Sequence, residues 1–232
     1  TEYHSTEEIH AWLDRLQAAF PNFITIETIG ETFEGRAVKL VKLSKKQVLE
    51  LRDNEINRFL INDFGLLQNN RAIFIEANIH AREWIASATA TYVLNELLYS
   101  TNPEIQEIAL NVDWYILPVL NADGYEYSRN SNRNWRKTRR PTSLICYGTD
   151  GNRNFEYNWL TKDETGDEGA SRAPCSDLYA GPNPFSEPET IALNNYLAAN
   201  YQKFDVYLSF HSYAHQILFP WGHSRQRIVS LI

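Results

Sequence analysis

The order of apolar and polar side chains along the chain predicts several strands. Residues 23–29 and 37–43 alternate apolar and polar positions with a period of two, which is the pattern of a half-buried strand. The run 72–79 is mostly apolar and predicts a more deeply buried strand. Further strands are predicted at 112–120, 204–210 and 215–219.

Helices are predicted between these strands. The segment Ser5–Glu8 has the composition of a capping box and predicts the start of a helix that ends before Pro21. A similar cap begins a helix predicted over 186–201. Residues 45–63 have an amphipathic pattern, whereas 84–98 is apolar on most faces and predicts a buried helix.

Strands and helices alternate along the chain. We therefore expect a layered α/β fold with a mixed, twisted and largely buried sheet that carries helices on both faces. The stretch 121–185 is rich in Asn, Gly, Pro and Arg and is predicted as a long loop, and a loop of that length is usually functional. Neither an internal repeat nor a low-complexity linker interrupts the sequence, so residues 1–232 are interpreted as one domain.

Composition and charge narrow the classes of partner. The chain has 232 residues, of which 43% are hydrophobic, and this is enough for a substantial core. Its net charge is −7, and the basic run 133–140 is a local exception, so we expect no nucleic-acid partner. No apolar stretch is long enough to span a membrane, so no membrane association is expected.

His80, Glu83 and His211 carry the strongest chemical signal. Each histidine follows a predicted strand, and open α/β sheets bind ligands at the carboxyl ends of their strands. Two imidazoles and a carboxylate leave one position of a tetrahedral zinc open, as in catalytic zinc sites. A His-x-x-Glu tetrapeptide also occurs often by chance, so this motif alone does not establish a metal site.

Four residues of the long loop offer matching chemistry. The amide of Asn152 and the guanidinium of Arg153 are suited to bind a carboxylate. Arg136 is a fixed cation that can lie beside a developing oxyanion. Asp150 can orient a histidine ligand through its other ring nitrogen. The alternative for the two arginines is a solvated surface charge, and the alternative for Asp150 is a turn residue.

The two cysteines bear on the compartment. Cys146 and Cys175 both lie in turn-rich sequence. A disulfide between them would indicate an extracellular protein, whereas two free thiols would fit a cytosolic one. The number of cysteines does not decide between these interpretations.

Six segments match one known family in the same order. They are Glu34–Arg36, Ile79–Trp84, Asn121–Glu126, Asn132–Lys137, Gly151–Asn154 and Phe210–Tyr213. On these segments the chain resembles the zinc metallocarboxypeptidases of the pancreatic A/B type, digestive enzymes that remove C-terminal residues from polypeptides. The resemblance covers nearly the whole chain. It implies a carboxypeptidase-like fold, one zinc ion, and hydrolysis of the C-terminal peptide bond by a zinc-activated water.

The resemblance also implies a role for each candidate residue. His80, Glu83 and His211 would bind zinc, and Asp150 would support His80. Arg136 would polarise the scissile carbonyl and stabilise the oxyanion. The remaining residues would bind the substrate: Asn152 and Arg153 its terminal carboxylate, and Arg82, Arg133 and Tyr213 the upstream peptide.

The resemblance bears on compartment and partners as well. Cys146 and Cys175 match the position of the family's disulfide, which implies a secreted, extracellular protein. Polypeptide C-termini are the implied substrates, and protein carboxypeptidase inhibitors are further implied partners. We expect a monomer.

Finally, the resemblance implies that the catalytic domain is incomplete. In the family, the general-base glutamate, the mobile capping tyrosine and the residue at the base of the specificity pocket lie further along than this chain runs. The N-terminus resembles the start of the family's mature enzyme, so we expect the chain to lack the pro-segment. No Asp or Glu follows Asp205, so no general base is assigned. We expect a fragment of an active enzyme. The alternatives are a homologue that binds zinc or a peptide terminus without hydrolysis, and a zinc deacylase of N-acyl amino acids.

Overall fold

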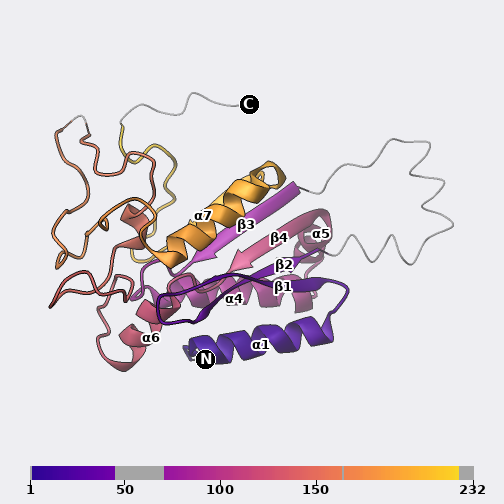
Figure 1. The fold of residues 1–232 in the computed structure, drawn as a ribbon. Helices are drawn as coiled ribbons and strands as arrows, with labels where there is room; N and C mark the ends of the chain where they lie inside the picture. The colour runs from indigo at the N-terminus through magenta and orange to yellow at the C-terminus, as the bar shows by residue number, and fades with distance from the viewer. Residues whose placement is uncertain (1, 45–70, 164, 225–232) are drawn as a thin grey trace.

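The computed structural model describes residues 2–44, 71–163 and 165–224, which form one mixed five-stranded sheet with helices packed against it (Figure 1). The strands are β1 (Ile24–Glu31), β2 (Ala37–Leu43), β3 (Arg71–Ala77), β4 (Val112–Leu117) and β5 (Val206–Phe210). Their order across the sheet is β1-β2-β4-β3-β5. Strand β2 pairs antiparallel with β1 and β4, whereas β3 pairs in parallel with β4 and β5. The predicted mixed α/β fold is confirmed.

The helices account for most of the remaining described chain. They are α1 (Thr6–Ala19), α4 (Trp84–Tyr99), α5 (Pro103–Asn111), α6 (Ala122–Asn130) and α7 (Pro188–Asn200), with short 3₁₀ turns η1 (Gly151–Arg153) and η2 (Tyr201–Lys203). The capping box of α1 is present, because Ser5 Oγ accepts from Glu8 N at 3.1 Å while Glu8 Oε2 accepts from Ser5 N at 2.8 Å. The amphipathic helix expected over 45–63 lies outside the described residues.

Helices cover both faces of the sheet, as expected. Adjacent side chains along a strand point to opposite faces. Ile75 of β3 therefore belongs to a core with Leu13 of α1 and Leu94 of α4, whereas its neighbour Phe74 belongs to a core with Leu193 of α7. Figure 1 shows α1 and α4 on one side of the sheet and α7 on the other. Both faces of the central strands are thus covered by helices, which explains why the sequences of these strands are nearly continuously hydrophobic.

Two observed helices are absent from the pattern-based prediction. Helix α5 begins with Asn102, whose side chain accepts from Glu104 N at 2.9 Å, and has Pro103 in its first turn. Helix α6 begins with Asn121, whose side chain accepts from Gly124 N at 3.0 Å, so the predicted loop 121–185 starts one residue ahead of a helix. Both starts carry the Asn cap that favours a helix. Helix α5 also has Ile105, Ile108 and Ala109 at helical spacing, whereas the sequence of α6 is too polar to show a clear apolar stripe.

Strand β5 departs from the expected burial. It lies at the edge of the sheet, and Val206, Tyr207 and Leu208 are 42%, 44% and 39% exposed. The strand expected over 215–219 is wrong, because those residues are irregular. Within the described ranges, no helix combines the length and the apolar character that crossing a membrane requires.

Candidate metal centre

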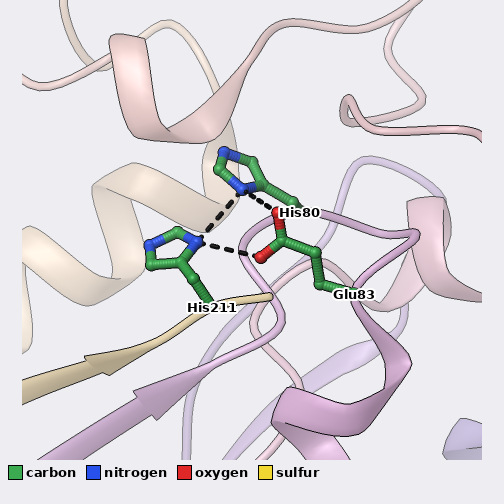
Figure 2. A group of neighbouring side chains, drawn as sticks. All are labelled: His80, Glu83 and His211. Carbon is green, nitrogen blue, oxygen red and sulfur yellow. Dashed lines mark hydrogen bonds and ion pairs between the residues drawn. The ribbon is translucent and has the colours of Figure 1, made fainter. Parts of the chain in front are cut away.

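His80, Glu83 and His211 meet at one edge of the sheet. His80 and Glu83 lie in the turn between β3 and α4, and His211 directly follows β5. Because β3 and β5 are parallel neighbours, their carboxyl ends lie side by side and deliver the two histidines to the same place. Figure 2 shows both imidazoles turned toward the Glu83 carboxylate. The convergence expected from the sequence is thus observed.

The geometry of this group fits a metal ion. His80 Nδ1 is 2.8 Å from Glu83 Oε1, His211 Nδ1 is 2.9 Å from Glu83 Oε2, and the two Nδ1 atoms are 3.1 Å apart. Two nitrogens bound to a tetrahedral zinc at about 2.0–2.1 Å would lie roughly 3.3 Å apart. Imidazole nitrogens and a carboxylate are also ligands that zinc prefers. The residues present therefore fit a single zinc ion without rearrangement of the backbone.

Glu83 is held in its ionised form. Burial opposes ionisation, but hydrogen bonds with His211 and His80, the charge of His80 and the backbone N–H of Ser212 more than offset it and lower the pKa of Glu83 to about 2. A ligand carboxylate that is already ionised requires no proton release when a metal binds.

Asp150 lies behind His80, as predicted. Its Oδ1 is 3.2 Å from His80 Nε2, and its Oδ2 accepts from the Nη2 and Nε atoms of Arg136 at 2.9 and 3.0 Å. Asp150 is fully buried. Burial would raise its pKa, but the hydrogen bond from His80 and the charges of His80, Arg136 and Arg153 outweigh it, so the pKa lies below its ordinary value. Asp150 is therefore more than the turn residue considered as its alternative.

Arg136 is neither a surface charge nor remote from the ligands. Its side chain is only 12% exposed, and its Nη1 lies 3.9 Å from Glu83 Oε1. A backbone hydrogen bond also holds Arg136 beside the ligand segment, because Ala81 N donates to Arg136 O at 3.0 Å. The segment that carries two ligands is thus tied directly to the segment that carries the cation.

Asn152 and Arg153 lie in the short turn η1 immediately after Asp150. Asn152 N donates to Asp150 Oδ1 at 3.0 Å, and Arg153 Nε donates to Gly169 O at 2.6 Å. Gly151 permits this placement, since a Cβ there would stand 2.8 Å from Ile79 Cγ1. The structure therefore connects both residues to the histidine ligand through Asp150.

Arg82 and Arg133 flank the ligand segment. Arg133 Nη1 donates to Arg82 O at 2.7 Å, and its guanidinium stacks 3.9 Å from the centre of the Trp84 ring. Arg82 pairs with Asp177 at 3.2 Å. Tyr213 follows the segment that donates to Glu83, and its side chain is 96% exposed. Arg82 and Tyr213 are close in sequence to the metal ligands, and Arg133 contacts Arg82. The role of these three residues in binding peptide remains a prediction.

Sequence patterns did not single out two polar residues beside His211. Ser209 Oγ lies 3.1 Å from His211 Nε2 and donates to Glu76 Oε2 at 2.6 Å. Glu76 is 1% exposed. A signal was available, because Glu76 is the one charged residue in the mostly apolar run 72–79.

The loop that follows the centre is closed by a disulfide. Cys146 and Cys175 are bonded, with their Cα atoms 5.1 Å apart. The pairing implied by the resemblance is confirmed, and the alternative of two free thiols is excluded.

Comparison with known proteins agrees with this geometry. The family model described as zinc carboxypeptidase matches residues 9–230. A zinc carboxypeptidase of Simulium vittatum is 42% identical over 226 residues, covering 97% of this chain and 66% of the relative, and carboxypeptidase B of Astacus astacus is 41% identical over 224 residues, covering 96% and 65%. The chain therefore spans slightly less than two thirds of the length of these relatives.

Solved structures show the same fold. Bovine thrombin-activatable fibrinolysis inhibitor in complex with tick carboxypeptidase inhibitor superposes with a TM-score of 0.79 at 33% identity, covering 97% of this chain and 66% of that one. A second structure of thrombin-activatable fibrinolysis inhibitor has a TM-score of 0.83 and covers 97% and 51%. With a family model matched along nearly its whole length and a His-Glu-His centre in place, the chain belongs to the zinc carboxypeptidase family.

Proposed function

We propose that this protein is a zinc-dependent exopeptidase that hydrolyses the C-terminal peptide bond of polypeptides. The observation that carries the proposal is the convergence of His80, Glu83 and His211, whose ligand atoms lie within 4.8 Å of one another. A zinc ion bound there would make a coordinated water more acidic and would polarise a carbonyl oxygen.

The surrounding residues suit peptide chemistry. Arg136, fixed by Asp150 at the edge of the ligand group, would stabilise the oxygen that gains negative charge during attack. Asn152 and Arg153 would bind the terminal carboxylate of the substrate, and a carboxylate anchored at a fixed distance selects the last peptide bond. Arg82, Arg133 and Tyr213 would contact the upstream peptide.

The disulfide supports an extracellular location, because disulfides persist in oxidising compartments. A protein carboxypeptidase inhibitor is a fitting partner, since a structural relative is known in complex with one from a tick. We propose that such an inhibitor would occupy the substrate-binding side of the same centre.

Peptide cleavage tests the proposal. The zinc-loaded full chain is incubated with peptides that end in Phe, Arg or Glu and with their C-terminal amides, and products are identified by mass spectrometry. We expect release of single C-terminal residues from the free acids and at least a hundredfold slower release from the amides, since an unpaired anchor discriminates strongly. Removal of zinc should abolish release, and added zinc should restore it. Activity that survives complete zinc removal, or equal cleavage of acids and amides, would contradict the proposal.

One observation favours a second candidate, a homologue that binds a peptide terminus without hydrolysis. Each acidic group described at the centre is already engaged: Glu83 with both histidines, Asp150 with His80 and Arg136, and Glu76 with Ser209. Zinc-dependent binding of a free-acid peptide with no product would support this candidate. Turnover of an N-acyl amino acid without turnover of peptides would instead indicate a deacylase.

A further inference from the structure

A polar line of hydrogen-bonding groups runs from the buried Glu76 through Ser209 to His211. Glu76 Oε2 accepts from Ser209 Oγ at 2.6 Å, and Ser209 Oγ is 3.1 Å from His211 Nε2. The other ring nitrogen, His211 Nδ1, faces Glu83 and His80 (Figure 2). The line therefore ends on the side of the imidazole opposite to the ligand group.

The sheet itself builds this line. In the parallel pairing of β3 with β5, Glu76 lies opposite Ser209. His211 directly follows β5, two positions after Ser209, and its Nε2 lies 3.1 Å from Ser209 Oγ. The register that brings the two histidine-bearing turns together also places a carboxylate and a hydroxyl directly beneath His211.

The number of protons on each group fixes the tautomer of His211. A serine hydroxyl has one hydrogen, and Ser209 gives it to Glu76. Its contact with His211 Nε2 is then satisfied only if Nε2 carries the imidazole hydrogen and donates it to Ser209 Oγ. The lone pair of the neutral imidazole therefore resides on Nδ1, the nitrogen that faces the other two ligands.

The burial of Glu76 is hard to explain by packing. It is 1% exposed and follows four apolar residues of β3, Ala72–Ile75. A buried carboxylate costs stability unless it is fully paired, and an apolar side chain of similar size usually serves a core as well or better. Its place near the carboxyl end of β3 is consistent with a role at the neighbouring centre.

His80 provides an internal comparison. Its Nε2 lies 3.2 Å from Asp150 Oδ1, so a carboxylate supports that ligand directly. His211 reaches its carboxylate through one hydroxyl. Both histidines thus have the carboxylate support that metal-binding histidines commonly have, although the two are built differently.

We propose that Glu76 and Ser209 are positioning residues that hold His211 in the tautomer and ring orientation needed to bind zinc. The inference rests on the proposed zinc site, but it concerns metal binding rather than hydrolysis. Neither residue contacts the ligand atoms, so both act only through the far nitrogen of the ring.

Zinc affinity is the first test. The dissociation constant of the full chain is measured by competition with a chromophoric chelator for the wild type, Ser209→Ala, Glu76→Leu and Ser209→Thr. We expect Ser209→Ala and Glu76→Leu to weaken zinc binding by about 10- to 100-fold, the usual effect of losing such support. Ser209→Thr keeps the hydroxyl and should stay within about threefold of the wild type. Ser44→Ala, at the residue that directly follows β2, is the matched control and should leave the zinc affinity unchanged.

The tautomer is tested directly in the wild type, so the proposal does not depend on the folding of any variant. In the zinc-free protein at about pH 8, nitrogen NMR should show the hydrogen of the neutral His211 imidazole on Nε2. In Ser209→Ala and Glu76→Leu we expect a mixture of tautomers or the hydrogen on Nδ1. A wild-type hydrogen on Nδ1 would overturn the proposal. A folded Ser209→Ala protein with wild-type zinc affinity would overturn it as well.

These readouts separate the inference from the proposed function. If the chain binds zinc through the predicted tautomer but cleaves no peptide, the exopeptidase proposal fails and the positioning role stands. If peptide cleavage occurs but Ser209→Ala binds zinc as the wild type does, the positioning role fails and the exopeptidase proposal stands.

Discussion

Glu189 should make the stability of the fold depend on pH. Its side chain lies in the first turn of α7 and is 1% exposed. Phe33 N donates to its Oε1 at 3.4 Å, and its Oε2 has no hydrogen-bond partner among the described residues. Burial first, and then the neighbouring charges of Glu187 and Asp123, raise the pKa of Glu189 from 4.5 to about 8.

The sign follows from proton binding. Between pH 4.5 and 8 the folded state holds a proton on Glu189 that the unfolded chain has released, so the free energy of unfolding must fall as the pH rises. The stabilisation is fully present below pH 4.5 and is lost as the pH passes through 8. One pKa unit corresponds to about 1.4 kcal/mol, which sets an upper limit of roughly 4 kcal/mol lost between pH 5 and 9.

Glu189→Gln removes this titration while preserving the shape of the side chain. We expect the variant to match the zinc-loaded wild type within about 1 kcal/mol at pH 5 and to exceed it by about 1 to 4 kcal/mol at pH 9. Urea unfolding of both proteins between pH 5 and 9 measures the difference, and the contribution of zinc to pH dependence is common to the two. A difference that does not change with pH would show that Glu189 is ionised in the fold, and the reasoning would be refuted.

Glu187→Gln is the matched control at the start of the same helix. Glu187 is equally buried, but its carboxylate accepts hydroxyl hydrogens from Thr138, Thr149 and Ser186. An amide group presents only one oxygen, so at least one hydroxyl loses its acceptor. We expect this variant to lose about 1 to 3 kcal/mol at every pH, in contrast to the gain at high pH for Glu189→Gln.

Three further outcomes are expected. Asp150→Asn should weaken zinc binding by about 10- to 100-fold in chelator competition, because the single oxygen of an amide cannot accept from both His80 and Arg136. A zinc affinity within about threefold of the wild type would contradict the supporting role of Asp150. Replacing Cys146 and Cys175 together by Ala should cost roughly 3 to 4 kcal/mol in denaturant unfolding, the entropy of freeing a loop with a sequence separation of 29, and an unchanged midpoint would refute it. Gly148→Ala should lower the free energy of unfolding by more than about 2 kcal/mol, because its φ is 79° and a Cβ would overlap the Thr138 carbonyl oxygen. Gly166→Ala, with a φ of 84° but open space around the Cβ, should lower it by only about 1 kcal/mol. Equal losses in the two variants would show that the overlap at Gly148 is relieved.

The elements with strong periodicity were predictable from the sequence. The two-residue alternation of 23–29 and 37–43 corresponds to β1 and β2, and the mostly apolar run 72–79 contains β3. The metal centre was predictable for a topological reason, because His80 and His211 follow strands and the carboxyl ends of parallel neighbours coincide. Local pattern and sheet geometry sufficed in these cases.

The remaining features depend on contacts that a sequence does not display. Helix α6 is itself a polar segment, and its start is marked by one Asn121 hydrogen bond. The exposure of β5 follows from its position at the sheet edge, which depends on strand order rather than on its apolar sequence. The pairing of Glu76 with Ser209 joins residues 133 positions apart and is visible only once the register of β3 and β5 is known.

The metal ligands and the neighbouring cation are coupled through one carboxylate. Asp150 uses Oδ1 for His80 and Oδ2 for Arg136, and its backbone leads directly into the turn that carries Asn152 and Arg153. A change in the orientation of Asp150 must therefore move a metal ligand, the cation and the proposed carboxylate anchor together. Groups that share a hydrogen-bond network do not contribute additively. Substitutions of Arg136 and Asp150 should accordingly cost less in combination than the sum of their separate effects.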